Sequence, residues 1–138
     1  MISYVDSIAI VRRLIAEGPP LDSWGTWDAA VTSQVGRIEV HRTLARLRHE
    51  GRLTLRTAAT AISDFEEMES GILWLPLTDR VAAIAAGPFP SVLKALDAIH
   101  MASAIFVREI NGSELVFVTH DRQLANAAVA MGFLVEGT

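Results

Sequence analysis

The chain has 138 residues, of which 51% are hydrophobic and 20% are charged, and its formal net charge is −4. This composition is typical of a globular domain with a substantial core, and it excludes a disordered or low-complexity chain. The sequence contains no cysteine, which excludes disulfides, thiolate metal sites and cysteine nucleophiles.

The sequence predicts the elements from short apolar runs and from apolar residues at helical spacing. In chain order these are a strand at 2–5, a helix at 8–15, a strand at 29–31, helices at 34–50 and 57–69, a strand at 72–77, a short helix ending at 86, a long helix ending near 110, a strand at 115–118, a helix at 121–131 and a strand at 133–135. The expected N-caps of four of the helices are Ser7, Thr32-Ser33, Thr78-Asp79 and Ser91. Pro76 favours the end of a strand or an edge position.

Strands that alternate with helices predict a parallel sheet with helices on both faces. No repeat, linker or change of composition divides the chain, so we expect a single domain over residues 1–138. Charged residues interrupt the N-terminal segment, and no apolar stretch is long enough to span a membrane. We therefore expect a cytoplasmic protein without membrane contact.

Four acidic residues attract attention because of their position. Asp6 follows the first strand, and Asp121 lies three residues beyond Val118, the end of the fourth strand. Glu39 and Asp97 stand within otherwise apolar helices, where an unpaired carboxylate is costly to bury. Ligands of open α/β sheets bind at the carboxyl ends of the strands, so a parallel sheet can bring all four together.

Each acid also has a structural explanation when taken alone. Asp6 and Asp121 can cap helices, and Glu39 can pair with Arg42 or Arg46 on its own helix. Four carboxylates at one point, however, repel each other unless a cation neutralises them. Oxygen ligands favour Mg²⁺ or Mn²⁺, which position water and stabilise charge on a phosphoryl group. Metal-dependent hydrolysis of a phosphodiester is the reaction class that follows.

Four segments in this order resemble the PIN-domain ribonucleases, in particular the VapC-type toxins of bacterial toxin–antitoxin pairs. They are YVDSIA at 4–9, SQVGRIEVHR at 33–42, LDAIHMA at 96–102 and FVTHDRQL at 117–124. The resemblance implies a three-layer α/β/α sandwich around a parallel sheet of four to five strands. It also implies an RNA substrate, a homodimer, and an antitoxin whose tail enters the acidic groove, often bringing an arginine.

The resemblance assigns roles to individual residues. It implies an acidic quartet that binds one or two Mg²⁺ or Mn²⁺ ions and activates water. The four residues of this quartet are Asp6, Glu39, Asp97 and Asp121. Within this quartet Asp6 and Asp97 match the acids most directly on the metal. Ser7 and Thr119 match small hydroxyl residues beside the site. Ile8 departs from the family, which often has a second serine or threonine there.

Positive charge is concentrated in residues 37–56, which hold six arginines against two glutamates. On a helical wheel, Arg42 and Arg46 share a face with Glu39 and Glu50. This arrangement predicts either guidance of a phosphate backbone toward Glu39 or a ladder of ion pairs along the helix.

Three aromatic side chains also have open roles. His100 lies one turn after Asp97 and either orients it or packs in the core. Trp24 and Trp27 either stack on bases or close a loop over the core or a dimer partner.

Three functions are compared with the sequence features above. The first is an endoribonuclease that uses a divalent metal and leaves a 5′-phosphate and a 3′-hydroxyl. The second is a PIN-like module that binds RNA or an antitoxin with negligible chemistry. The third, phosphoryl chemistry on small molecules, is disfavoured because Ile8 stands where a haloacid-type phosphatase needs an aspartate. A receiver domain needs a lysine late in the chain, and the only lysine is Lys94.

Overall fold

The computed structural model describes residues 1–112 and 114–138. The strands are β1 (Ile2–Val5), β2 (Ala29–Ser33), β3 (Ile72–Leu75), β4 (Leu115–Val118) and β5 (Leu134–Glu136). The helices are α1 (Ser7–Leu14), α2 (Gln34–His49), α3 (Leu55–Glu69), α4 (Asp79–Ala86), α5 (Ala95–Asn111) and α6 (Arg122–Ala130).

The strands form one parallel sheet in the order β3-β2-β1-β4-β5. In the register of the two central strands, Val5 of β1 lies beside Val118 of β4. After β1 the chain moves to β2 on one side, and after β3 it returns to β4 on the other side. The carboxyl ends of β1 and β4 therefore border the point where the winding direction changes, which is where open α/β sheets bind ligands.

The two faces of the sheet are covered by separate cores because neighbouring residues of a strand point to opposite faces. Val5 and Val118 belong to the core that also contains residues of α1, α2 and α3. Tyr4 and Phe117 belong to the core that contains residues of α5 and α6.

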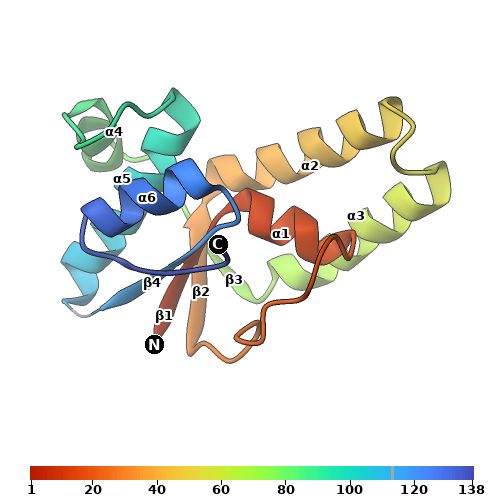
Figure 1. Ribbon diagram of the computed structural model, residues 1–138, viewed down its shortest axis with the longest axis horizontal. Coiled ribbons are helices and arrows are strands. Elements are labelled where there is room, and N and C mark those ends of the chain that lie inside the picture. The colour runs from red at the N-terminus through yellow and green to blue at the C-terminus, as the bar shows by residue number, and fades with distance from the viewer. Residues whose placement is uncertain (113) are drawn as a thin grey trace.

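Figure 1 shows the helices on the two sides of the sheet, with α2 and α3 forming a long hairpin whose tip extends away from it. The predicted three-layer α/β/α sandwich with a parallel sheet is confirmed. None of the described helices is long and apolar enough to cross a membrane.

The largest difference from the sequence prediction lies at the start of the long helix. Ser91 does not cap it, because α5 begins only at Ala95 with Lys94 in the N-cap position. Val92 is 89% exposed, and Leu93 packs against the core without a helical turn, so a helix at this point is not needed to bury an apolar side chain. The first helix likewise has Asp6 rather than Ser7 as its N-cap.

Candidate functional site

Asp6 lies buried at the junction of the two central strands. Its backbone N–H donates to the carbonyl of Val118 at 2.9 Å, which ties the end of β1 to the end of β4. The Asp6 side chain is not used as a helix cap. Its Oδ2 instead accepts from the Thr119 hydroxyl at 2.9 Å, and its Oδ1 accepts from the Ser7 hydroxyl at 3.5 Å. Both predicted hydroxyl residues therefore contact Asp6.

His100 joins Asp6 to Glu39. Its Nε2 lies 2.5 Å from Glu39 Oε1 and 3.7 Å from Asp6 Oδ1, and its Nδ1 lies 2.7 Å from the hydroxyl of Tyr4. Because a carboxylate only accepts, Nε2 carries the proton in the bond to Glu39. The imidazole is almost completely buried. It therefore holds Glu39 beside Asp6 and does not bond directly to Asp97.

Asp97 and Asp121 reach the same end of the sheet from helix N-termini. Asp97 stands in the first turn of α5 and is half-buried. Asp121 is the N-cap of α6, and its Oδ1 accepts from the backbone N–H of Leu124 at 3.0 Å. Both positions suit carboxylates because helix N-termini are electropositive.

The electrostatics indicate that Asp6, Glu39 and Asp97 lie within range of one another and that Asp121 lies within range of Asp97. Burial raises the pKa of Asp6, and the charges of Glu39 and Asp97 add to this rise. Burial also raises the pKa of Asp97, with Asp121 as the next contributor. Burial lowers the pKa of His100, but its hydrogen bond to Glu39 and the charge of Asp6 outweigh this, so that its pKa is raised overall. The structure thus brings the acidic quartet together.

The quartet is suited in chemistry to a hard divalent cation. All its donor atoms are oxygens, and after burial the charges of neighbouring carboxylates contribute to the raised pKa values of Asp6 and Asp97, a repulsion that a cation would relieve. Among the described side chains, however, no three or more His, Asp or Glu groups already form a metal-binding cluster. Mg²⁺ commonly uses one or two carboxylates and keeps several waters, so a complete protein cage is not needed.

The two arginines predicted to guide phosphate lie on exposed turns of α2 beyond Glu39. Arg46 forms an exposed ion pair with Glu50 at 3.4 Å. Arg42 forms no ion pair among the described residues, and Glu39 bonds to His100 instead. Of the ion pairs expected along this face of α2, only the one between Arg46 and Glu50 is therefore present among the described residues.

The two tryptophans are half-buried and pack against the core on the α1, α2 and α3 side. Their rings meet edge to face at a centroid distance of 5.3 Å. This packing matches the expectation that they close the loop over the core. Sequence reasoning did not single out Tyr4, because a tyrosine in a buried strand is indistinguishable from an ordinary core residue.

Comparison with known proteins places the chain in a family. The family model of the PIN domain matches residues 4–130. Ribonuclease VapC47 of Mycobacterium tuberculosis is 32% identical over 139 aligned positions, which cover 95% of this chain and 93% of that protein. Ribonuclease VapC45 of the same species is 33% identical over 133 positions, with 94% and 90% coverage.

A solved structure supports the fold independently. VapBC2 from Rickettsia felis, bound to a DNA fragment from its promoter, matches with a TM-score of 0.67 at 11% identity, covering 99% of this chain and 98% of that one. The chain belongs to the PIN-domain family. Its relatives of similar length include VapC ribonucleases of Mycobacterium tuberculosis.

Proposed function

We propose that this protein is an endoribonuclease, the toxin of a toxin–antitoxin pair, and that its acidic quartet holds Mg²⁺ or Mn²⁺. The observation that carries the proposal is the gathering of the four carboxylates at the carboxyl end of the sheet, with Asp6 buried between Thr119 and His100. The names of the M. tuberculosis relatives support ribonuclease activity.

In this proposal Asp6 and Asp97 hold the metal ion most directly, and Glu39 and Asp121 complete its surroundings. When bound, the cation stabilises charge that develops on the phosphoryl group and positions the attacking water. Thr119 and Ser7 keep the Asp6 carboxylate oriented, and His100 keeps Glu39 beside it. Arg42 and Arg46 attract the phosphate backbone toward this end of α2.

The hydrolysis itself balances without another reactant. Water attacks phosphorus in line, its proton passes to a carboxylate of the quartet, and the bond from phosphorus to the 3′ oxygen breaks. The 3′ oxygen takes a proton from solvent, so the products carry a 5′-phosphate and a 3′-hydroxyl.

We further propose that the protein is cytoplasmic and dimeric and that an antitoxin inhibits it by inserting a basic tail into the acidic groove. The structural match to VapBC2 supports such a partner. A positively charged tail also suits a groove in which carboxylates raise one another's pKa.

The test is cleavage of total bacterial RNA by the purified protein, with Mg²⁺, with Mn²⁺ and in chelator, followed by mapping of the new ends. We expect metal-dependent cuts that leave 5′-phosphates and that Asp6→Asn and Asp97→Asn abolish. If either variant cleaves as well as the wild type, the mechanism is wrong. Tight RNA binding with and without metal, and no cleavage, would instead support the binding module.

A further inference from the structure

A cavity beside the acidic quartet has no role in the mechanism above. We call it the loop cavity. It measures about 240 Å³ and lies between α1, the loop that follows it, and His120. The residues that line it are Ala9, Arg12, Arg13, Ala16, Glu17, Gly18, Pro19, Pro20, Leu21, Trp24 and His120.

Two segments of chain connect the loop cavity to the quartet, although no residue of the quartet lines the cavity. His120 stands between Thr119, which bonds to Asp6, and Asp121. On the opposite wall, Arg12 follows Asp6 by six residues along α1, which corresponds to about 9 Å at 1.5 Å per residue. A nucleotide in this cavity would therefore be close enough to the quartet to belong to the same RNA strand as a phosphate held there.

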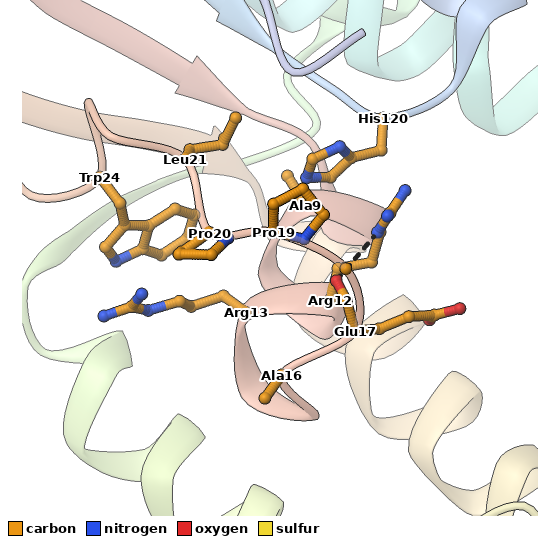
Figure 2. Close-up of a pocket in the computed structure, with 11 residues that line it drawn as sticks. Ala9, Arg12, Arg13, Ala16, Glu17, Pro19, Pro20, Leu21, Trp24 and His120 are labelled. Atoms are coloured by element: carbon orange, nitrogen blue, oxygen red, sulfur yellow. Dashed lines mark hydrogen bonds between the residues drawn. The ribbon is translucent and has the colours of Figure 1, made fainter.

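The polar groups at the cavity suit a nucleotide. Figure 2 shows the Arg12 guanidinium extending toward His120 and the Arg13 guanidinium beneath Trp24. The Arg13 guanidinium lies 5.7 Å from the centre of the Trp24 ring, which is a cation–π distance. Neither arginine forms an ion pair among the described residues, and Figure 2 shows the Glu17 side chain extending away from Trp24. Arg12 Nε donates to the carbonyl oxygen of Glu17 at 3.5 Å, so both positive charges remain without a carboxylate partner among the described residues.

His120 adds a polar group that can read a base or a ribose. Its Nδ1 lies 2.7 Å from the carbonyl oxygen of Gly137. A carbonyl only accepts, so Nδ1 carries the proton, and Nε2 of the neutral ring is left as an acceptor. Base amino groups and the ribose 2′-hydroxyl are donors of matching chemistry.

The remaining wall is apolar and its backbone is preformed. Pro19 and Pro20 have restricted φ angles, and Leu21 and Trp24 pack against the core. Gly18 has φ +73°, and a Cβ there would lie 2.5 Å from an Arg12 Nη atom. The positive φ favours glycine, and a larger residue would displace the end of the Arg12 side chain. The cavity is smaller than the roughly 300–1,000 Å³ typical of drug-sized ligands, which fits a single base.

We propose that the loop cavity binds one nucleotide of single-stranded RNA that flanks the scissile phosphate along the strand, with its base on the apolar wall and its phosphate at Arg12 and Arg13. The inference rests on the proposed ribonuclease function and adds a subsite to it.

The test measures binding of a labelled single-stranded RNA pool of random sequence, about ten nucleotides long. Every protein carries Asp97→Asn so that the RNA stays intact. We expect the pair Arg12→Gln and Arg13→Gln to weaken binding about tenfold or more, because charge-assisted hydrogen bonds are lost. The control pair, Arg48→Gln and Arg52→Gln, removes the same charge at the tip of the α2–α3 hairpin and should change binding less than about twofold.

A second readout locates the RNA. The sequence has three tryptophans, so Trp27→Phe with Trp74→Phe leaves Trp24 as the only indole. We expect RNA to change the Trp24 fluorescence, and the Arg12 and Arg13 substitutions to abolish that change.

The outcomes separate this inference from the function. Equal binding by the cavity variant and its control, or no fluorescence response at saturating RNA, would overturn the subsite even if the wild type cleaves RNA. Intact RNA binding combined with loss of a co-expressed antitoxin would assign the loop cavity to the protein partner instead and would also overturn it. Absence of cleavage by the wild type would count against the proposed function itself.

Discussion

The Thr119 hydroxyl connects two members of the acidic quartet. It donates to Asp6 Oδ2 at 2.9 Å and accepts from the backbone N–H of Asp121 at 3.0 Å. One side chain at the end of β4 thus sets the orientation of the first acid and the position of the last. A hydroxyl can do both because it is a donor and an acceptor at once.

His100 has a similar bridging role deeper in the molecule. It contacts Glu39 on α2 and Tyr4 on β1, and the Tyr4 hydroxyl in turn accepts from the backbone N–H of Ser33 at 3.1 Å. Every group in this chain except Glu39 is buried. Removal of one member leaves buried polar atoms without partners, which is costly.

We therefore expect His100→Ala to lower the free energy of unfolding by about 2–4 kcal/mol, from the cavity and the lost hydrogen bonds together. Urea denaturation in chelator measures this. His49→Ala is the matched control, since His49 is exposed at the end of α2, and its effect should stay within about 0.5 kcal/mol. An unchanged urea midpoint for His100→Ala would contradict the bridging role.

At the scale of residues, the sequence predicts the four acids better than the residues that hydrogen-bond to them. Asp6, Glu39, Asp97 and Asp121 were found because carboxylates at strand ends or in apolar helices are unusual. The contact of Tyr4 with His100 spans 96 residues and joins two types that also occur in ordinary cores. No local pattern encodes such a contact, so only the fold reveals it.

At the scale of elements, four different segments each contribute one carboxylate to the quartet: the end of β1, the middle of α2 and the N-termini of α5 and α6. Repulsion among these charges opposes the packing that brings the elements together. The helix N-termini offset part of it, since a carboxylate there gains about 0.3–1 kcal/mol.

For metal-free protein we expect Asp97→Asn to raise the free energy of unfolding, within the roughly 0.5–2 kcal/mol typical of relieved surface charge. Asp79→Asn removes a carboxylate from the first turn of α4, away from the quartet. This variant should lower the free energy of unfolding by about 0.3–1 kcal/mol, because the favourable charge at the helix N-terminus is lost. Opposite signs in thermal melts in chelator would therefore separate repulsion from the helix-terminal effect. A lower melting temperature for Asp97→Asn would count against a clustered quartet.

The same thermal melts can be repeated with Mg²⁺ or Mn²⁺ in place of chelator. The wild type and Asp79→Asn should gain stability by mass action, whereas Asp97→Asn should gain less or nothing.

The elements themselves were largely predictable because apolar runs and helical spacing are strong local signals. The start of α5 was not, since Ser91 is a good cap by type but Val92 is exposed and Leu93 packs against the core without a helical turn. The strand at 72–77 proved shorter, and β3 ends at Leu75, immediately before Pro76. Element ends depend on tertiary packing and on a single proline or cap, which periodicity cannot resolve.

At the scale of the whole molecule, charge is divided between the acidic quartet and the basic segment 37–56, which spans most of α2 and the start of α3. Some arginines of this segment already have an ion-pair partner. Arg37 pairs with Glu69 at 3.0 Å and lies over the Trp74 ring, and Arg46 pairs with Glu50. Arg42 forms no ion pair among the described residues and stands one turn from Glu39. It is therefore the arginine of α2 best placed to attract a phosphate toward the quartet.

This division of charge predicts a graded effect on RNA binding. In the Asp97→Asn background, Arg42→Gln should reduce the slope of log affinity against log salt concentration by about 0.7, the value for one phosphate contact on a single strand. Arg46→Gln should reduce it less because Arg46 is shared with Glu50, and Arg48→Gln, at the far end of α2, should leave it unchanged. Equal reductions for all three variants would mean that the arginines of residues 37–56 form a diffuse positive surface and do not direct the phosphate toward Glu39.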